Sequence, residues 1–396
     1  MNELPAELMA TVAEDVYALT KLDTLEEALK FLNSKYGQMF DLPFSKNTLI
    51  KGKTGGPSFL KCRTAFGFTL IGKGILDGHA FFIFRGTQYL ADWLTNMNVS
   101  TSNSTLGQPV HDGFNEAFKS MEPQLIHFMG QLSNYKIHTV NSIGHSLGGA
   151  IATICGEWVT MTYGRGTKIY TFGSPRVGLE TFSSFCTGSV GAGNIYRAYH
   201  KTDIVPCIPT WPFYHTPLPG CGRDYYLPSP GVIPMAEYHG MDKYVESVRG
   251  KSWDALVGLR NLGKDEGRIK RWLTETVPAS LSMITINNLS EALSFVIAKC
   301  VQGAQWLLSK TFSTSFTFMD QLAYILDKGI NLAGSASVWV LNLIKKIMQM
   351  LGMVATVKLE DLSVKFMREV LVNMQIKINR YTKDAFNQVM VNGRAI

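Results

Sequence analysis

The sequence predicts an α/β fold with parallel strands in its sheet, followed by a separate region of apolar helices. Short β-rich runs alternate with helical patterns from about residue 60 to residue 200, which is typical of parallel strands joined by helices. Hydrophobic residues make up 46% of the 396 residues, enough for a large core, and only 17% are charged. This composition excludes a disordered chain, and a mean hydropathy of +0.04 excludes a polytopic membrane protein.

The first 34 residues predict two helices, within residues 6–34. Leu8, Val12 and Val16 recur at helical spacing, and Thr24 is a candidate N-cap for the second helix. The N-terminus is acidic and has no basic stretch before its apolar residues, so it does not resemble a secretory signal. We therefore expect synthesis in the cytoplasm, and any export by a route that needs no signal peptide.

The elements of the α/β region follow in a regular order. Gly72 and Gly74 separate the first two runs, which suggests adjacent strands. The expected elements are strands at 66–71 and 79–84, a helix at 114–132, a strand at 137–143, a helix at 147–162, and strands at 168–172 and 195–199. Residues 211–234 hold six prolines and predict a long loop near the end of this region.

The positive charge of the chain lies at its end. Residues 1–250 contain 20 basic and 20 acidic residues, whereas residues 251–396 contain 18 basic and 11 acidic ones. We therefore predict a first domain at 1–250, which includes the helices of 6–34, and a cationic helical region at 251–396. This region either contacts an anionic membrane, or packs on the first domain, or forms an oligomer interface.

No segment of the cationic region is a clear membrane span. Its longest uncharged run is only 16 residues, 329–344, and polar residues interrupt it, whereas a span needs about 20 apolar residues. A last amphipathic helix is expected over the residues that follow, with an apolar face formed by Leu359, Leu362, Phe366, Val370 and Met374.

The six cysteines show no metal-ligand spacing. Most are expected to be buried thiols. Cys207 and Cys221 flank part of the Pro-rich loop and could form a disulfide in an oxidising compartment. The sequence leaves both states open.

A Gly-His-Ser-Leu-Gly string at 144–148 is the strongest candidate for a catalytic site. An apolar strand precedes it and a helical pattern follows it, which is the strand–turn–helix context of a nucleophile elbow. The glycines at either side leave room for the strained turn. The helix N-terminus would stabilise negative charge that develops at the reacting centre. Ser146 is therefore the candidate nucleophile.

A serine nucleophile needs a general base and a carboxylate that orients it. Asp203 follows the strand at 195–199, where the carboxyl ends of the strands gather; the alternative is an Asp that only caps its loop. His239 is the favoured base, and His215 is the alternative. We interpret His145 and His200 as structural.

Two backbone amides are candidates for an oxyanion hole. One is the N–H of Leu147, the residue after the nucleophile. The other is Thr87, which follows an earlier strand through Gly86, a residue that permits close approach. The alternative is that Arg85 and Gly86 form only a turn that ends the strand.

Six collinear stretches resemble the class 3 lipase family, the relatives of the filamentous-fungal lipases. They are FRGT at 84–87, ADWLTN at 91–96, VHDGF at 110–114, GHSLGG at 144–149, YTFGSPRVG at 170–178, and residues 196–209. The resemblance implies an α/β-hydrolase fold with Ser146, Asp203 and a late histidine as the triad. The short spacing from Asp203 to His239 departs from the family pattern, and nothing after residue 250 belongs to it.

The resemblance also implies hydrolysis of carboxylic esters through an acyl-enzyme, without a metal or an organic cofactor. In the family, the segment after the oxyanion position acts as a lid. Here that segment would present an apolar face formed by Tyr89, Leu90, Trp93 and Leu94. The alternative is an ordinary amphipathic helix.

The leading hypothesis is a phospholipase that acts on membrane glycerophospholipids and reaches them through residues 251–396. By architecture, the chain also resembles the antibacterial lipase effectors that contact-dependent secretion machines deliver, which an inhibitory or immunity protein would restrain. One alternative is an intracellular triacylglycerol lipase or small-ester esterase. Another is a membrane-disrupting protein with a vestigial hydrolase. We expect a lipid substrate, peripheral association with a target membrane, and no nucleic-acid partner.

Overall fold

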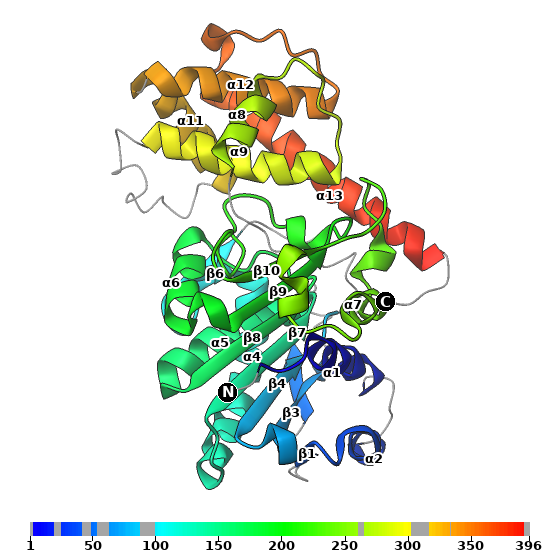
Figure 1. Cartoon of the computed structure of the whole chain (residues 1–396). Helices are drawn as coiled ribbons and strands as arrows, with labels where there is room; N and C mark the ends of the chain where they lie inside the picture. The colour runs from blue at the N-terminus through cyan, green and yellow to red at the C-terminus, as the bar shows by residue number, and fades with distance from the viewer. Residues whose placement is uncertain are drawn as a thin grey trace.

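The computed structural model describes residues 3–19, 25–41, 49–53, 63–87, 100–259, 265–301, 317–332 and 334–391. A central sheet with helices on both faces forms the lower body in Figure 1, and a bundle of helices lies at one end of this sheet. The chain has an α/β-hydrolase fold with an added helical region, as the sequence predicts.

The main sheet is mixed, with five adjacent parallel strands. Its strand order is β1-β3-β4-β7-β8-β9-β10, and β2 pairs with β3 beside this path. The strands are β1 (Phe40–Asp41), β2 (Leu49–Lys53), β3 (Arg63–Gly72), β4 (His79–Phe84), β7 (Thr139–His145), β8 (Gly166–Phe172), β9 (Ile195–His200) and β10 (Arg223–Leu227). Strands β4, β7, β8, β9 and β10 run parallel to one another, whereas β1, β2 and β4 are antiparallel to β3. The carboxyl ends of the parallel strands therefore share one edge.

Helices cover both faces of the sheet and create two apolar cores. One core contains side chains of α1 (Ala6–Leu19), α2 (Leu25–Tyr36) and α7 (Met241–Val248). The opposite core contains side chains of α4 (Asp112–Gln131), α5 (Leu147–Tyr163) and α6 (Glu180–Val190). A two-stranded sheet of β5 (Thr101–Asn103) and β6 (Pro109–His111) precedes α4. The strands and helices expected along residues 6–200 are present, with small shifts at their ends.

The helical region is packed against the hydrolase. Its helices are α8 (Glu266–Thr274), α9 (Met283–Val301), α11 (Phe318–Leu332), α12 (Gly334–Leu351) and α13 (Val364–Val391). Their apolar side chains join the core of α4, α5 and α6 in one continuous cluster. In Figure 1, α13 runs diagonally from the bundle toward α7. Of the described helices, α9 alone is apolar and long enough to span a membrane, and 56% of its most apolar window is buried inside the molecule.

The segment that joins the two parts packs with the hydrolase. Trp253 is fully buried against Tyr170, Tyr196 and Tyr225, and its indole Nε1 donates to the Leu4 carbonyl at 3.1 Å. The bundle itself begins only at α8. The hydrolase core therefore continues beyond Gly250, although the charge composition changes there.

For the chain after residue 200, the structure corrects one expectation and decides between the two states that the sequence left open for Cys207 and Cys221. The last helix begins at Val364, not near Leu359, because Leu359–Asp361 forms a 3-10 turn and Ser363 Oγ accepts the N–H of Phe366 at 3.2 Å as an N-cap. No disulfide joins Cys207 to Cys221, because Cys207 is a buried free thiol and Cys221 an exposed one.

Candidate active site

A strained turn holds Ser146 between β7 and α5. Ser146 has φ 56° and ψ −128°, and no other non-glycine residue in the described part of the chain has a positive φ. A Cβ at Gly144 would lie 2.0 Å from the carbonyl oxygen of Gly148, and one at Gly148 would lie 2.3 Å from that of Phe84. The turn therefore requires both glycines, as a nucleophile elbow does.

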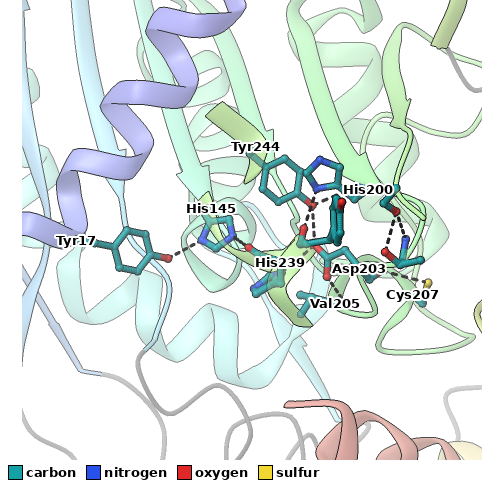
Figure 2. Close-up of polar contacts among 11 residues, drawn as sticks. Tyr17, His145, His200, Asp203, Val205, Cys207, His239 and Tyr244 are labelled. Atoms are coloured by element: carbon teal, nitrogen blue, oxygen red, sulfur yellow. Dashed lines mark hydrogen bonds and ion pairs between the residues drawn. The ribbon is translucent and has the colours of Figure 1, made fainter. Parts of the chain in front are cut away.

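Asp203 and His239 form a buried pair at the same edge of the sheet. Asp203 follows β9, and His239 ends the 3-10 turn η6 (Ala236–His239) before α7. His239 Nδ1 donates to Asp203 Oδ2 at 2.8 Å, and each residue is 1% exposed. Oδ2 also accepts the Tyr244 hydroxyl at 2.6 Å, and Oδ1 accepts the backbone N–H of Val205 at 3.0 Å. Figure 2 shows Tyr244 and His239 converging on this carboxylate.

His145 links the N-terminal helix to the same pair. The Tyr17 hydroxyl lies 2.6 Å from His145 Nδ1 and accepts the backbone N–H of Gly86 at 2.8 Å. His145 Nε2 lies 2.7 Å from the carbonyl oxygen of His239, and the two imidazole rings lie 4.6 Å apart. Tyr17, His145 and His239 lie in one row in Figure 2.

The contacts of His145 determine its tautomer. Because a carbonyl oxygen only accepts, Nε2 carries the proton and Nδ1 accepts the hydroxyl hydrogen of Tyr17. Burial lowers the pKa of His145 well below its ordinary value, and the neighbouring His239 lowers it further. His145 is therefore a neutral link that fixes the backbone of the histidine paired with Asp203.

The other two histidines of the region have partners outside this pair. His200 Nδ1 donates to the carbonyl oxygen of Tyr238 at 2.8 Å, and Nε2 lies 2.8 Å from the Ser247 hydroxyl. His215, the alternative base, lies 3.1 Å through Nε2 from the Arg197 guanidinium. Burial and the charge of Arg197 hold the pKa of His215 well below its usual range. His215 does not contact Asp203, so this geometry favours His239 as the base.

The oxyanion candidates lie beside the nucleophile. Leu147 is the first residue of α5, where a backbone N–H has no acceptor within the helix. Thr87 follows Gly86, and a Cβ on Gly86 would lie 2.8 Å from Cβ of Ser146. Ser146 is only 2% exposed, and its hydroxyl has no hydrogen-bond partner among the described residues. The site is therefore closed in this conformation.

The structure does not describe the lid candidates, and it adds two site residues that the sequence did not predict. The lid candidates Tyr89, Leu90, Trp93 and Leu94 lie outside the described residues. Tyr17 and Tyr244 were not predicted as site residues, because neither belongs to a motif and both reach the site only through the fold. The apolar periodicity of residues 6–19 predicts that this helix is packed on one face, but it does not predict which part of the protein that face contacts.

Comparison with known proteins shows which family part of this chain resembles. Residues 81–213 match the family model described as Lipase (class 3). Over these residues the chain resembles the class 3 lipases. The secreted mono- and diacylglycerol lipase 1 of Fusarium solani is 36% identical over 129 residues, which is 32% of this chain and 38% of that protein. A lipase of Rhizomucor miehei is 28% identical over 168 residues, 40% of this chain and 44% of that protein.

The likeness to these lipases is partial in length. The chain spans about two fifths of each of these two curated relatives. A solved lipase from Rhizopus microsporus var. chinensis shares 24% identity with a TM-score of 0.40, and the match covers 57% of this chain and 75% of that one. The family match ends at residue 213, so the lipase model includes Ser146 and Asp203 but not His239 or the helical bundle.

Proposed function

We propose that this protein is a serine lipase that hydrolyses carboxylic ester bonds of lipids. The observation that carries the proposal is the buried Asp203–His239 pair beside the strained elbow of Ser146, which lies in the stretch that resembles the class 3 lipases. A nucleophile, a base and a carboxylate that orients the base are the elements of acyl transfer.

The proposed reaction runs in two halves. His239 Nε2 takes the proton of Ser146 Oγ as the oxygen attacks the ester carbonyl carbon, and the alcohol leaves with that proton. The N–H groups of Leu147 and Thr87 donate to the oxyanion, and Asp203 holds the imidazole through Nδ1. Water then attacks the acyl-enzyme, and the fatty acid leaves. Because Ser146 is 2% exposed, the site must open before a lipid enters.

For the substrate, we propose glycerophospholipids at a membrane surface. The positive excess of residues 251–396 supports this, because anionic bilayers attract cations. Met353, Val354 and Leu359 also expose apolar side chains on the segment after α12, beside the exposed Lys358. The alternative is an acylglycerol, which the name of the Fusarium relative supports. Export as an antibacterial effector stays a prediction from the sequence.

The test measures fatty-acid release by the full chain from three substrates: anionic phospholipid vesicles, a diacylglycerol emulsion and a short soluble ester. We expect release from vesicles and a loss of at least about 10⁴-fold in kcat for Ser146→Ala and His239→Gln. Ser133→Ala serves as the matched serine control, because that hydroxyl is exposed and bonds only within its turn.

The three substrates separate the possible outcomes. Fatty-acid release from the emulsion but not from the vesicles would overturn the phospholipid proposal and would still support a lipase. Activity that persists in Ser146→Ala would overturn the lipase assignment itself. Leakage of vesicles by Ser146→Ala without ester hydrolysis would favour a membrane-disrupting protein.

A further inference from the structure

A cavity lies where the α/β domain meets the helical bundle. It has a volume of about 500 Å³, within the range of small-molecule sites. The α/β domain contributes Arg176, Arg197 and His215 to its wall, and α8 and α9 contribute Arg268 and Ser290. Ser146 and His239 do not line it, so it is separate from the catalytic site.

Arg176 is a buried cation of this cavity that pairs with no described carboxylate. It is 5% exposed, and its Nη1 donates to the carbonyl oxygens of Cys207 at 2.5 Å and Pro209 at 2.8 Å. The carboxylate on the bundle side, Glu291, instead forms an ion pair with Arg268 at 2.5 Å. Burial lowers the pKa of Arg176 only to about 10, so it stays charged at neutral pH. Buried charges are normally paired, and an anion in the cavity would supply the pair.

Arg197 and His215 each have one N–H group that finds no hydrogen-bond acceptor among the described residues. Arg197 Nη1 pairs with Asp224 at 2.5 Å, and Nη2 donates to His215 Nε2 at 3.1 Å. Because Nε2 accepts and the ring is neutral, the proton of His215 is on Nδ1. Within the described residues, neither His215 Nδ1 nor Arg197 Nε has a hydrogen-bond partner. Arg197 is only 1% exposed, so this donor is also out of reach of bulk solvent.

The bundle contributes a third group of the same kind. The Ser290 hydroxyl is buried, its residue is 8% exposed, and no described atom bonds to it. Among the described residues, three guanidinium groups line the cavity, and two of them form ion pairs, Arg197 with Asp224 and Arg268 with Glu291, which leaves the charge of Arg176 unpaired. The rest of the wall includes four aromatic residues: Tyr199, Phe213, Tyr214 and Tyr226.

We propose that this cavity binds a small amphiphile whose head is an oxyanion, a carboxylate or a phosphate ester. The head would neutralise Arg176 and accept from the donors around it, and the aromatic wall would contact the apolar body. The site exists only where the bundle covers the α/β domain. Arg176 also holds the carbonyl of Cys207, four residues after Asp203, so the ligand lies behind the loop that carries this residue.

Isothermal titration calorimetry on the full chain tests the proposal with decanoate and decyl phosphate, both below their micellar concentrations. Decanol is the neutral control, and inorganic phosphate tests the head alone. We expect at least one of the two anionic amphiphiles to bind at least about tenfold more tightly than decanol. The amphiphile that binds more tightly shows whether the site prefers a carboxylate or a phosphate ester as the head. If inorganic phosphate binds tightly and neither anionic amphiphile does, the proposal that the ligand is an amphiphile is overturned.

Two variants locate the binding site. Arg268→Gln removes one cation of the wall, and we expect it to weaken binding about tenfold. Arg271→Gln is the matched control, because Arg271 is exposed on the same helix and does not line the cavity. Asn287→Phe, at a partly exposed position of the wall, should block binding by filling the cavity.

The proposal fails if decanol binds as tightly as both anionic amphiphiles, or if none of the probes binds. It also fails if Arg268→Gln and Asn287→Phe, shown to be folded by circular dichroism, bind like the unmodified chain. In that case the ligand occupies another site, such as the acyl-binding site of the α/β domain.

Discussion

Glu157 is a buried acid that the proposed catalytic reaction does not use. It lies in α5, is 1% exposed, and neither carboxyl oxygen has a hydrogen-bond partner in the described part of the chain. Burial raises its pKa from 4.5 to about 8. The folded protein therefore keeps this proton at a pH where the unfolded chain has lost it, and stability falls as the pH rises from about 4.5 to 8.

We expect Glu157 to lower the free energy of unfolding by about 3 kcal/mol between pH 5.5 and pH 8. Glu157→Gln keeps the shape and cannot ionise, so its unfolding free energy should lack this decline. Urea unfolding of both proteins at the two pH values measures the difference. Equal pH dependence in the two proteins would show that Glu157 is not the source.

The elbow between β7 and α5 depends on a close contact with β4. A Cβ at Gly148 would meet two backbone carbonyl oxygens, those of Phe84 at 2.3 Å and Arg85 at 2.6 Å. Backbone atoms cannot rotate away as a side chain does, so Gly148→Ala must displace α5 from β4. We expect a loss of about 2–3 kcal/mol in unfolding free energy and the loss of ester hydrolysis.

Gly188→Ala is the matched control for this prediction. Gly188 lies in α6, and a Cβ there would meet no atom within 4 Å. Alanine should stabilise that helix by about 0.5–1 kcal/mol and leave hydrolysis unchanged. Similar losses in the two variants, measured by urea unfolding and ester hydrolysis, would contradict a specific contact at the elbow.

Elements whose side chains are apolar could be predicted from the sequence, and elements held by buried charges could not. Strand β4, HAFFIF, is a mostly apolar run, and β7, TVNSIGH, leads into the nucleophile motif; both were predicted. Strand β10 was missed because its sequence, RDYYL, includes Asp224, whose burial depends on the Arg197 guanidinium of β9 at 2.5 Å. No local pattern records such a pairing.

The same distinction holds for the candidate site. Ser146, Asp203 and His239 could be proposed because motif and chain order constrain them. Tyr17 and Tyr244 could not, because Tyr17 bonds a histidine 128 positions away and Tyr244 a carboxylate 41 positions away. Their roles follow from how α1 and α7 pack on the sheet.

At the scale of the whole molecule, Trp253 joins the two ends of the α/β domain. Its ring packs among tyrosines of β8, β9 and β10, and its Nε1–H bonds to Leu4. We expect Trp253→Ala to destabilise the protein by about 3–5 kcal/mol. Val257→Ala, at a position 54% exposed in the same segment, should cost less than about 0.5 kcal/mol.

Thermal unfolding followed by calorimetry measures both variants. The continuous core predicts a single transition for the full chain that shifts as a whole in Trp253→Ala. A second transition whose midpoint temperature is unchanged in Trp253→Ala would show that the bundle unfolds on its own. For the same reason, a truncation that tests the bundle should end after Leu259, because one after Gly250 also removes Trp253 from the hydrolase core.

Two contacts at the site also bear on the synthesis of the protein on the ribosome. They join Tyr17 to His145 and His145 to the backbone of His239. Residues 17, 145 and 239 leave the ribosome at widely separated times, and their contacts close loops of 128 and 94 positions. A nascent chain that already displays Ser146 still lacks His239, which is both the proposed base and the backbone partner of His145. Under the proposed function, ester hydrolysis can therefore begin only after more than half of the polypeptide has emerged.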